Sequence, residues 1–393
     1  MRLTHVSLSF FRNFQKLDLH LPPGLVVFHG DNAQGKSNLL EAIILLATTR
    51  SPRVDAEREL INWSALDEPL PVARVVADVE RGLAPVRIEV ALRALSSLPT
   101  QASGDAFPVE KRFKLDGLPQ TASQVVGQVR AVLFSTHDVE LVGGAPSSRR
   151  RFLDIALCQL DRQYMRHLQR YQRVLAQRNH LLRRLSQGLA RTQELAFWNE
   201  ELATHGAAIT AQRSGFLAKL QEHMEPTHRT LSRGQDSLVL TYCPSVPGGL
   251  PADPSTLEER FRVALRDSLP REIEAGSSHV GPHRDDLLFT LGGVDVGVYG
   301  SRGQRRTIAL SMRLAEVRLQ GARTGEHPLV LLDDVFAELD QHRRDHVIEA
   351  ISGYQQALLT TTDLDLVSPG LLAQASVYRV ESGTVTAASR SYG

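Results

Sequence analysis

The sequence predicts an α/β protein with a mixed β-sheet, an antiparallel β meander and a second, mostly helical lobe. Three observations support this class. A short apolar strand, LVVFHG, runs into a Gly-containing loop and then a helix. Apolar residues alternate within residues 3–20 and 72–115, and an apolar period near 3.6 extends through residues 147–224. We expect no coiled coil long enough to form an arm.

Length and composition limit the alternatives. A chain of 393 residues predicts two domains, or one with a large insertion. Its apolar content of 42% and charged content of 23% are those of an ordinary globular protein. The net charge is +1, so any nucleic-acid binding must come from local basic patches.

The same survey predicts a cytoplasmic location. Cys158 and Cys243 lack metal-type spacing and favour a reducing compartment. The N-terminal residues alternate like a strand and resemble no signal peptide. The longest apolar run, Ala42–Ala47, is far too short to cross a membrane, so we expect no membrane contact.

The pattern along the chain predicts two lobes. We expect residues 1–134 and 324–393 to form the first lobe and residues 135–323 the second. The first would hold the meander, buried strands near residues 329 and 357, and a C-terminal hairpin. The second would contain a long helical hairpin interrupted at Gly188, a short helix over about 255–268, and a β-hairpin near 287–297. A Pro/Ser/Gly-rich stretch at 95–108 predicts a surface loop.

Residues 30–37, GDNAQGKS, follow the pattern G-x-x-x-x-G-K-[ST] between a strand and a helix. In that context the loop N–H groups surround a phosphate, the lysine reaches the β- and γ-phosphate oxygens, and the hydroxyl ligates Mg²⁺. The alternative is a chance Gly-rich turn. The residues expected to contact the nucleotide are Gly30, Asp31, Asn32, Ala33, Gln34, Gly35, Lys36, Ser37 and Asn38.

Residues 329–334, LVLLDD, form an apolar strand that ends in two carboxylates. An aspartate at the carboxyl edge of a parallel strand beside a phosphate loop is suited to hold Mg²⁺. We assign Asp333 to the metal, together with Ser37, and Asp334 to the attacking water. Alone, this pattern would indicate only a polar strand end.

In residues 299–317, YGSRGQRRTIALSMRLAEV, a short polar segment that contains Gly303 directly precedes an amphipathic helix. Such a helix start is a second potential anion site. The alternative is an ordinary capped helix with solvated arginines.

Taken together, these segments resemble the ABC-type ATPases. The 30–37 and 329–334 segments match that family's Walker A and Walker B motifs, Ser301, Arg302, Gly303 and Gln304 match its signature, and Asp340 matches its D-loop. More narrowly, FRNF, GKSNLLEAI, SSRRRFLD, VGPHRDDL, GSRGQRRT and LLDDVFAELD resemble the bacterial RecF family, which is SMC-like.

This resemblance implies a function. ATP and Mg²⁺ would bind one subunit's Walker motifs while the signature of a second subunit closes on the γ-phosphate, giving an ATP-dependent homodimer. The family resemblance further implies double-stranded DNA near single-strand gaps as a ligand, RecR and RecO as partners, RecA loading as the outcome, and roles in replication, recombination and the SOS response. It also implies that Arg12, in FRNF, contacts nucleotide phosphates; the alternative is a surface arginine.

The departures from the ABC pattern predict a weak ATPase that acts as a switch, and the family resemblance implies that DNA stimulates it. Transporters carry Glu at the position of Asp334, and the shorter side chain should hold water less well, so hydrolysis should be slow. Ala33 stands where many relatives have Gly. A transporter-type switch histidine is also missing, with Thr361 and Thr362 near its position.

Residues 149–191 are rich in arginine, with few acids, although helical charge runs are usually only solvated. We expect sequence-independent DNA contacts there, and the residues assigned to DNA are Arg149, Arg150, Arg151 and Arg184. Three rival functions remain: a transport ATPase subunit with a membrane partner, a scaffold with an inactive site, and an SMC protein with coiled-coil arms.

Overall fold

The computed structural model describes residues 1–54, 56–68, 70–82, 84–95, 108–234, 237–249 and 254–388. Most of the loop predicted at 95–108 lies outside these residues.

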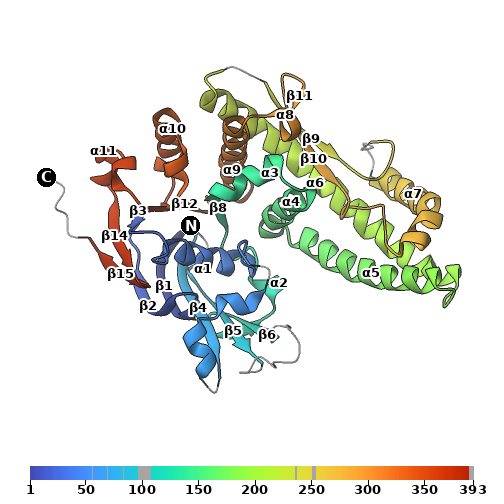
Figure 1. Cartoon of the computed structure of the whole chain (residues 1–393), viewed down its shortest axis with the longest axis horizontal. Coiled ribbons are helices and arrows are strands. Elements are labelled where there is room, and N and C mark those ends of the chain that lie inside the picture. Colours follow the sequence, from blue (N-terminus) through green and yellow to red (C-terminus); the bar gives the residue numbers. More distant parts are fainter. Residues whose placement is uncertain are drawn as a thin grey trace. The chain divides into compact units, whose positions relative to one another are not determined.

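The chain divides into two compact units, Met1–His137 with Glu316–Gly393, and Asp138–Ala315 (Figure 1). The sequence analysis placed the second boundary at 323/324, after the helix α9 (Arg302–Thr324). The boundary between the two units instead falls inside that helix. Its residues up to Ala315 belong to the second unit, and those from Glu316 onward belong to the first.

A six-stranded sheet with the order β15-β14-β3-β13-β12-β8 forms one layer of the first unit. Five strands run parallel, and only β15 is antiparallel to its neighbour. N-terminal β3 therefore lies between two C-terminal strands, β13 and β14. The strands are β3 (Gly24–His29), β8 (Ala131–Ser135), β12 (Leu329–Asp333), β13 (Gln356–Thr361), β14 (Ser376–Glu381) and β15 (Thr384–Ala387).

The second sheet of this unit is antiparallel, with the order β2-β1-β4-β5-β6-β7, which confirms the predicted meander. Helix α1 (Lys36–Thr48) is buried along nearly its whole length. Its leucines share one hydrophobic core with apolar residues of both sheets. The strands are β1 (Arg2–Phe11), β2 (Phe14–His20), β4 (Val72–Glu80), β5 (Val86–Ala94), β6 (Val109–Leu115) and β7 (Leu118–Gln120).

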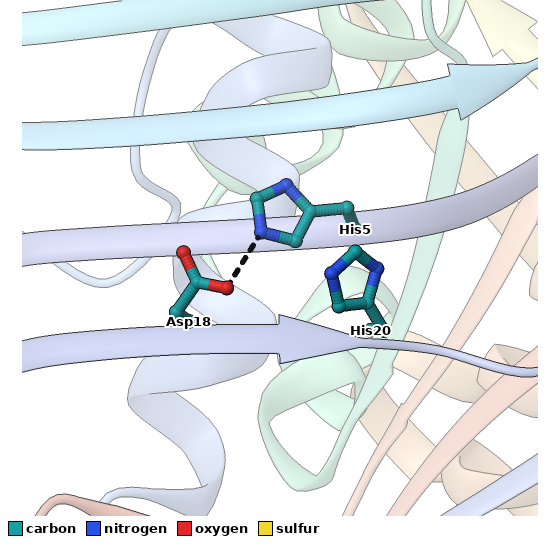
Figure 2. Close-up of side chains that lie close together, drawn as sticks. All are labelled: His5, Asp18 and His20. Atoms are coloured by element: carbon teal, nitrogen blue, oxygen red, sulfur yellow. Dashed lines mark hydrogen bonds and ion pairs between the residues drawn. The ribbon is translucent and has the colours of Figure 1, made fainter.

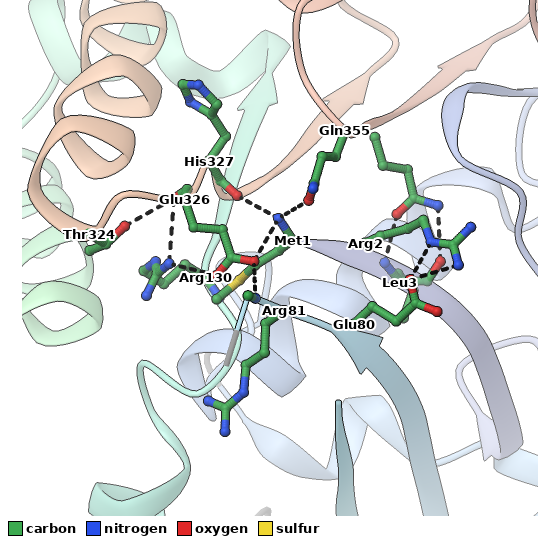
Figure 3. A network of polar contacts seen from close by, with 12 residues as sticks. Met1, Arg2, Leu3, Glu80, Arg81, Arg130, Thr324, Glu326, His327 and Gln355 are labelled. Carbon is green, nitrogen blue, oxygen red and sulfur yellow. Dashed lines mark hydrogen bonds and ion pairs between the residues drawn. The ribbon is translucent and has the colours of Figure 1, made fainter. Parts of the chain in front are cut away.

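A polar network ties the start of β1 to the parallel sheet (Figure 3). The buried side chain of Gln356 accepts a hydrogen bond from the Leu3 N–H at 2.8 Å and donates one to the Leu3 carbonyl at 2.9 Å. Arg2 donates from Nε to Glu80 at 2.9 Å. The backbone N–H and carbonyl of Leu3 are thus satisfied where β1 meets the parallel sheet.

The other helices of the first unit are short. They include α2 (Ala122–Val125), α10 (Gln341–Ser352) and α11 (Pro369–Leu372), together with 3₁₀ turns at Glu57–Leu60, Trp63–Asp67, Thr136–Asp138, Val335–Glu338 and Leu364–Leu366. The turn Thr136–Asp138 ends at the boundary with the second unit.

The second unit is mostly helical, with a small antiparallel sheet of order β11-β10-β9. The hairpin β10–β11 confirms the prediction near 287–297, whereas β9 was not predicted. Its elements are α3 (Val139–Gly143), α4 (Pro146–Leu160), α5 (Arg162–Ser186), the turn Thr192–Leu195, α6 (Ala196–Leu231), β9 (Leu238–Cys243), α7 (Pro254–Ala275), β10 (Asp286–Leu291), β11 (Val294–Asp295), α8 (Val296–Tyr299) and the start of α9.

The predicted helix over 147–187 is wrong in one respect, because it breaks at Asp161. The Asp161 carboxylate accepts hydrogen bonds from the N–H groups of Gln163 and Tyr164 at 2.7 and 3.2 Å, so it ends α4 and caps α5. The short helix predicted at 255–268 instead continues to Ala275. None of the helices in the described ranges combines the length and hydropathy needed to span a membrane.

Candidate nucleotide-binding site

The loop between β3 and α1 has a backbone that its two glycines make possible. Gly30 has φ 152°, and a Cβ there would lie 2.2 Å from the carbonyl oxygen of Val380. Gly35 has φ 117°, and a Cβ there would lie 2.6 Å from Nδ2 of Asn13. Both conformations disfavour a side chain, and both positions lack room for one. Asp31, Asn32 and Ala33 are exposed at the loop tip.

Ala33 occupies the left-handed region with φ 65°. That conformation costs an L-residue about 1–2 kcal/mol relative to Gly. The substitution noted in the sequence therefore leaves the loop shape intact but strains its backbone.

Lys36, the first residue of α1, is 6% exposed. Its Nζ donates hydrogen bonds to the carbonyls of Gly30 and Asp31 at 2.6 and 2.7 Å. Burial lowers the pKa of Lys36, and the nearby carboxylates of Asp334 and Asp333 oppose this effect. The ammonium group thus lies inside the curve of the loop, where the phosphate of a nucleotide would compensate its burial.

The two predicted Mg²⁺ ligands lie together. Ser37 Oγ donates a hydrogen bond to Oδ1 of Asp333 at 2.7 Å, although the two residues are 296 positions apart. Parallel strands β3, β13 and β12 bring them to one edge of the sheet. Thr360 Oγ1 donates to the same carboxylate oxygen at 2.9 Å. This set of hard oxygen donors fits Mg²⁺, which takes oxygen ligands and keeps several waters.

Asp334 directly follows and has features of a group that orients water. It adopts φ 52°, and its N–H donates to Thr360 Oγ1 at 2.9 Å. Its Oδ1 is buried with no hydrogen-bond partner among the described residues. Burial raises the pKa of the Asp334 carboxyl, while Lys36 acts in the opposite direction. An unpaired buried carboxylate oxygen beside the phosphate loop is available to a water molecule.

The guanidinium group of Arg12 is already occupied by partners other than the phosphate loop in this structure. Its Nε and NH2 groups donate to the two carboxylate oxygens of buried Glu41, both at 2.8 Å, and NH1 donates to the Glu59 carbonyl. Arg12 therefore neutralises a carboxylate on α1. A nucleotide contact by Arg12 remains a proposal, and it would require at least part of this pairing to open.

Asn13, the next residue, supports the loop directly and was missed by the sequence analysis. Its Nδ2 donates to the Gln34 carbonyl at 2.8 Å, and its Oδ1 accepts from Nδ2 of Asn38 at 2.9 Å. Gly383 N–H donates to the same Gln34 carbonyl at 3.0 Å. Thr360 was missed as well. Asn13 lies inside the FRNF segment, but no local pattern reveals that its amide reaches across to another loop.

The signature segment, Ser301–Gln304, forms a reciprocal cap on α9. The Ser301 N–H donates to Oε1 of Gln304 at 2.8 Å, and the Gln304 N–H donates to Ser301 Oγ at 3.2 Å. All four residues are exposed. Val298 and Tyr299, just before them, are 63% and 77% exposed. Within one chain the segment is thus a solvent-facing helix cap.

The D-loop residue Asp340 also caps a helix. Its carboxylate accepts a hydrogen bond from the Arg343 N–H at 2.9 Å and pairs with the Arg343 guanidinium at 2.7 Å. The residue is exposed at the start of α10.

The four arginines assigned to DNA differ in exposure and in their partners. Arg149 is 8% exposed and binds Asp286 through Nε and NH2 at 2.6 and 2.9 Å. Arg150 is partly buried and donates to the Asp285 carbonyl at 3.0 Å. A DNA contact by Arg149 remains a prediction, and it would require the guanidinium to leave the carboxylate with which it pairs in its own unit. Arg151 and Arg184 are exposed.

Four exposed arginines, one of them Arg184, lie along one face of α5. Positions 162, 166, 173 and 184 fall within a narrow arc at 100° per residue, and all four arginines are exposed. Arg178 points the other way and is fully buried, with hydrogen bonds to Glu272, Ser278 and Asn199. The basic stripe of α5 consists of Arg162, Arg166, Arg173 and Arg184.

Comparisons with known proteins assign the family. A family model described as RecF/RecN/SMC N terminal domain matches residues 2–386. The DNA replication and repair proteins RecF of Chloroflexus aurantiacus and Roseiflexus castenholzii are 44% and 42% identical to this chain over 397 and 392 residues. These alignments cover 98% of this chain and 100% and 99% of the two relatives. The chain belongs to the RecF family.

Structures agree with this assignment to the RecF family. A solved structure described as the recombination mediator protein RecF-ATP in the RecFOR pathway has a TM-score of 0.86 and 30% identity, covering 98% of this chain and 97% of that chain. An Smc head bound to a ScpA winged-helix domain has a TM-score of 0.55 at 15% identity, which shows a shared fold alone. The predicted fold, an ABC-type ATPase head, is confirmed, and no long coiled coil is found within the described ranges.

Proposed function

We propose that this chain is an ATP-gated clamp on double-stranded DNA that acts in recombinational repair. One observation carries the proposal: the 2.7 Å contact between Ser37 Oγ and Asp333 Oδ1. It joins the Walker A and Walker B segments into one set of oxygen donors beside the buried Lys36 ammonium. In this assignment the first unit binds ATP and Mg²⁺ through the loop residues 30–38, and the second unit carries the signature.

The second anion site at the start of α9 belongs, in this proposal, to a neighbour's nucleotide. Ser301 and Gly303 would contact the γ-phosphate held by another subunit, and two-fold symmetry would give two such contacts. The exposure of Ser301–Gln304 supports this, since a buried cap would have no access to a partner. Exposed Val298 and Tyr299 beside it supply the apolar contact that a subunit interface needs.

Hydrolysis would open the clamp. Bound Mg²⁺ supplies charge stabilisation for the phosphoryl group. Lys36 would neutralise the phosphate oxygens, and Asp334 would hold the attacking water through its unpaired Oδ1. Because aspartate reaches less far than glutamate, we expect slow turnover, with DNA stimulation arising from the dimer that DNA favours. A turnover of ~10² s⁻¹ or more would refute this part.

The basic stripe of α5 is the proposed DNA contact. Exposed guanidinium groups repeated along one helix face suit phosphates and carry no base-reading pattern, so binding would be independent of sequence. Relatives described as acting in the RecFOR pathway support RecR and RecO as partners, with RecA loading downstream.

Salt-dependent DNA binding in the presence of ATP and Mg²⁺ tests this assignment. The double variant Arg166→Glu/Arg173→Glu should bind a labelled duplex more weakly, and its log K against log salt slope should fall by about 2, because each lost phosphate contact removes about 0.9. The matched control is Arg266→Glu/Arg271→Glu on α7, whose side chains are also exposed. Equal losses in both variants would reduce the effect to net charge and reject α5 as the contact.

A further inference from the structure

A cluster of two histidines and an aspartate lies on the antiparallel sheet of the first unit (Figure 2). His5 is on β1, and Asp18 and His20 are on β2. His5 Nε2 lies 3.1 Å from Asp18 Oδ1, and the His5 and His20 ring centroids are 4.6 Å apart. One potential ligand atom from each residue lies within 4.8 Å of the other two. None of these residues takes part in the nucleotide site described above.

Strand register brings the three side chains together. His5 is directly opposite His20 in the β1–β2 pair. Asp18 and His20 are two positions apart on β2, so they share one face, while Leu17 and Leu19 face the core. The positions of the two imidazoles and the carboxylate on this face are therefore set by strand pairing and do not depend on a loop.

A carboxylate behind His5 orients its ring. His5 Nδ1 lies 3.2 Å from Asp78 Oδ2, where β4 pairs with β1. An Nδ1–H donated to that carboxylate leaves the Nε2 lone pair directed at Asp18, 3.1 Å away. A carboxylate on the far nitrogen of a histidine is the arrangement that orients metal-binding histidines and makes them more basic.

A simpler explanation is that a protonated His5 bridges Asp18 and Asp78 as a surface ion pair. That explanation leaves His20 without a role. The His20 ring lies beside the His5 ring at an interplanar angle of 33°, and its nitrogens make no hydrogen bond or ion pair with any described residue. It is also exposed and can rotate.

We propose that His5 Nε2, the Asp18 carboxylate and the His20 imidazole bind a transition-metal ion of the Zn²⁺ class. Two imidazoles and a carboxylate suit Zn²⁺, whereas Mg²⁺ and Ca²⁺ prefer oxygen ligands alone. Zinc bonds of about 2.0–2.1 Å place tetrahedral ligands about 3.3 Å apart. The His5–Asp18 separation of 3.1 Å is already close to this, and rotation of exposed His20 supplies the third ligand. Water takes the fourth position.

Zinc titration of the chelator-treated full-length protein tests the site, with a chromophoric chelator as competitor and excess Mg²⁺ present throughout. Asp18→Asn and His20→Gln keep side-chain size and should each weaken Zn²⁺ binding at least about tenfold. Asp78→Asn should also weaken it, by about 10–100-fold, because it releases the His5 ring. Co²⁺ in the wild type should give the intense visible absorption of a four-coordinate ion, and His20→Gln should lose it.

The matched control is His342→Gln/His346→Gln on α10. These rings lie 4.4 Å apart, four positions from each other on one helix, which is a spacing that can also hold a metal ion. The control should keep the site that His20→Gln loses. Zinc binding that survives Asp18→Asn and His20→Gln, or that disappears only in the α10 control, would overturn the proposal. So would a wild type that binds no Zn²⁺ at micromolar concentration, since His5 would then be a simple ion-pair bridge. Neither result bears on ATP binding, which uses other residues.

Discussion

The support that Asn13 gives to the phosphate loop leads to a quantitative prediction for Asn13→Ala. The side chain makes two hydrogen bonds, with the Gln34 carbonyl and the Asn38 amide, at 2.8 and 2.9 Å. Each is worth about 1 kcal/mol net. Loss of the Gln34 bond alone should raise the Kd for ATP about fivefold, and loss of both about thirtyfold, if the free loop relaxes to a shape that does not bind.

Competition of ATP against a fluorescent analogue, with Mg²⁺ present, measures this change. The matched control is Asn179→Ala, because Asn179 in the second unit also holds a backbone N–H, that of Ser278, at 2.8 Å. The control should lower the free energy of unfolding and leave ATP affinity unchanged. An Asn13→Ala protein that is folded by circular dichroism and binds ATP within about twofold of wild type would refute the reasoning.

Three further substitutions are informative. Ala33→Gly should raise the free energy of unfolding in urea by about 0.5–1 kcal/mol, because it relieves the left-handed backbone at φ 65°; a decrease would contradict this. Arg149→Ala should lower that free energy by about 2 kcal/mol, since it leaves Asp286 without its bidentate partner, and should not alter DNA affinity. Asp334→Asn should keep ATP binding but slow hydrolysis about 100-fold in a phosphate-release assay. In the wild type without nucleotide, burial raises the pKa of Asp334 in the folded state. The free energy of unfolding should therefore fall as pH rises from the ordinary Asp value through the raised pKa, and Asp334→Asn should lose this dependence.

The nucleotide loop could be predicted from the sequence because its determinants are local. A strand, two glycines, a lysine and a helix within a short segment specify both the backbone and the chemistry. The partnership of Ser37 with Asp333 could be predicted for a related reason, since parallel strands of one sheet end at the same edge.

The pairing of charges could not be predicted in the same way. Arg149 has the same local pattern as a surface arginine, yet its partner Asp286 lies 137 positions further along the chain. Arg12 meets Glu41 through a similar long-range contact. The histidine cluster was missed because His5 and His20 are ordinary polar positions of alternating strands until their register is known. The helix break at Asp161 was missed because the apolar period continues across it.

Sedimentation velocity tests the central claim, that ATP closes two subunits over each other's signature segments. Wild type and Ser301→Arg should be compared with ATP and Mg²⁺, with and without duplex DNA. The account predicts that wild type dimerises only with ATP and more tightly with DNA, and that Ser301→Arg binds ATP but remains monomeric. Equal dimerisation of the two proteins, or none in either, would contradict it.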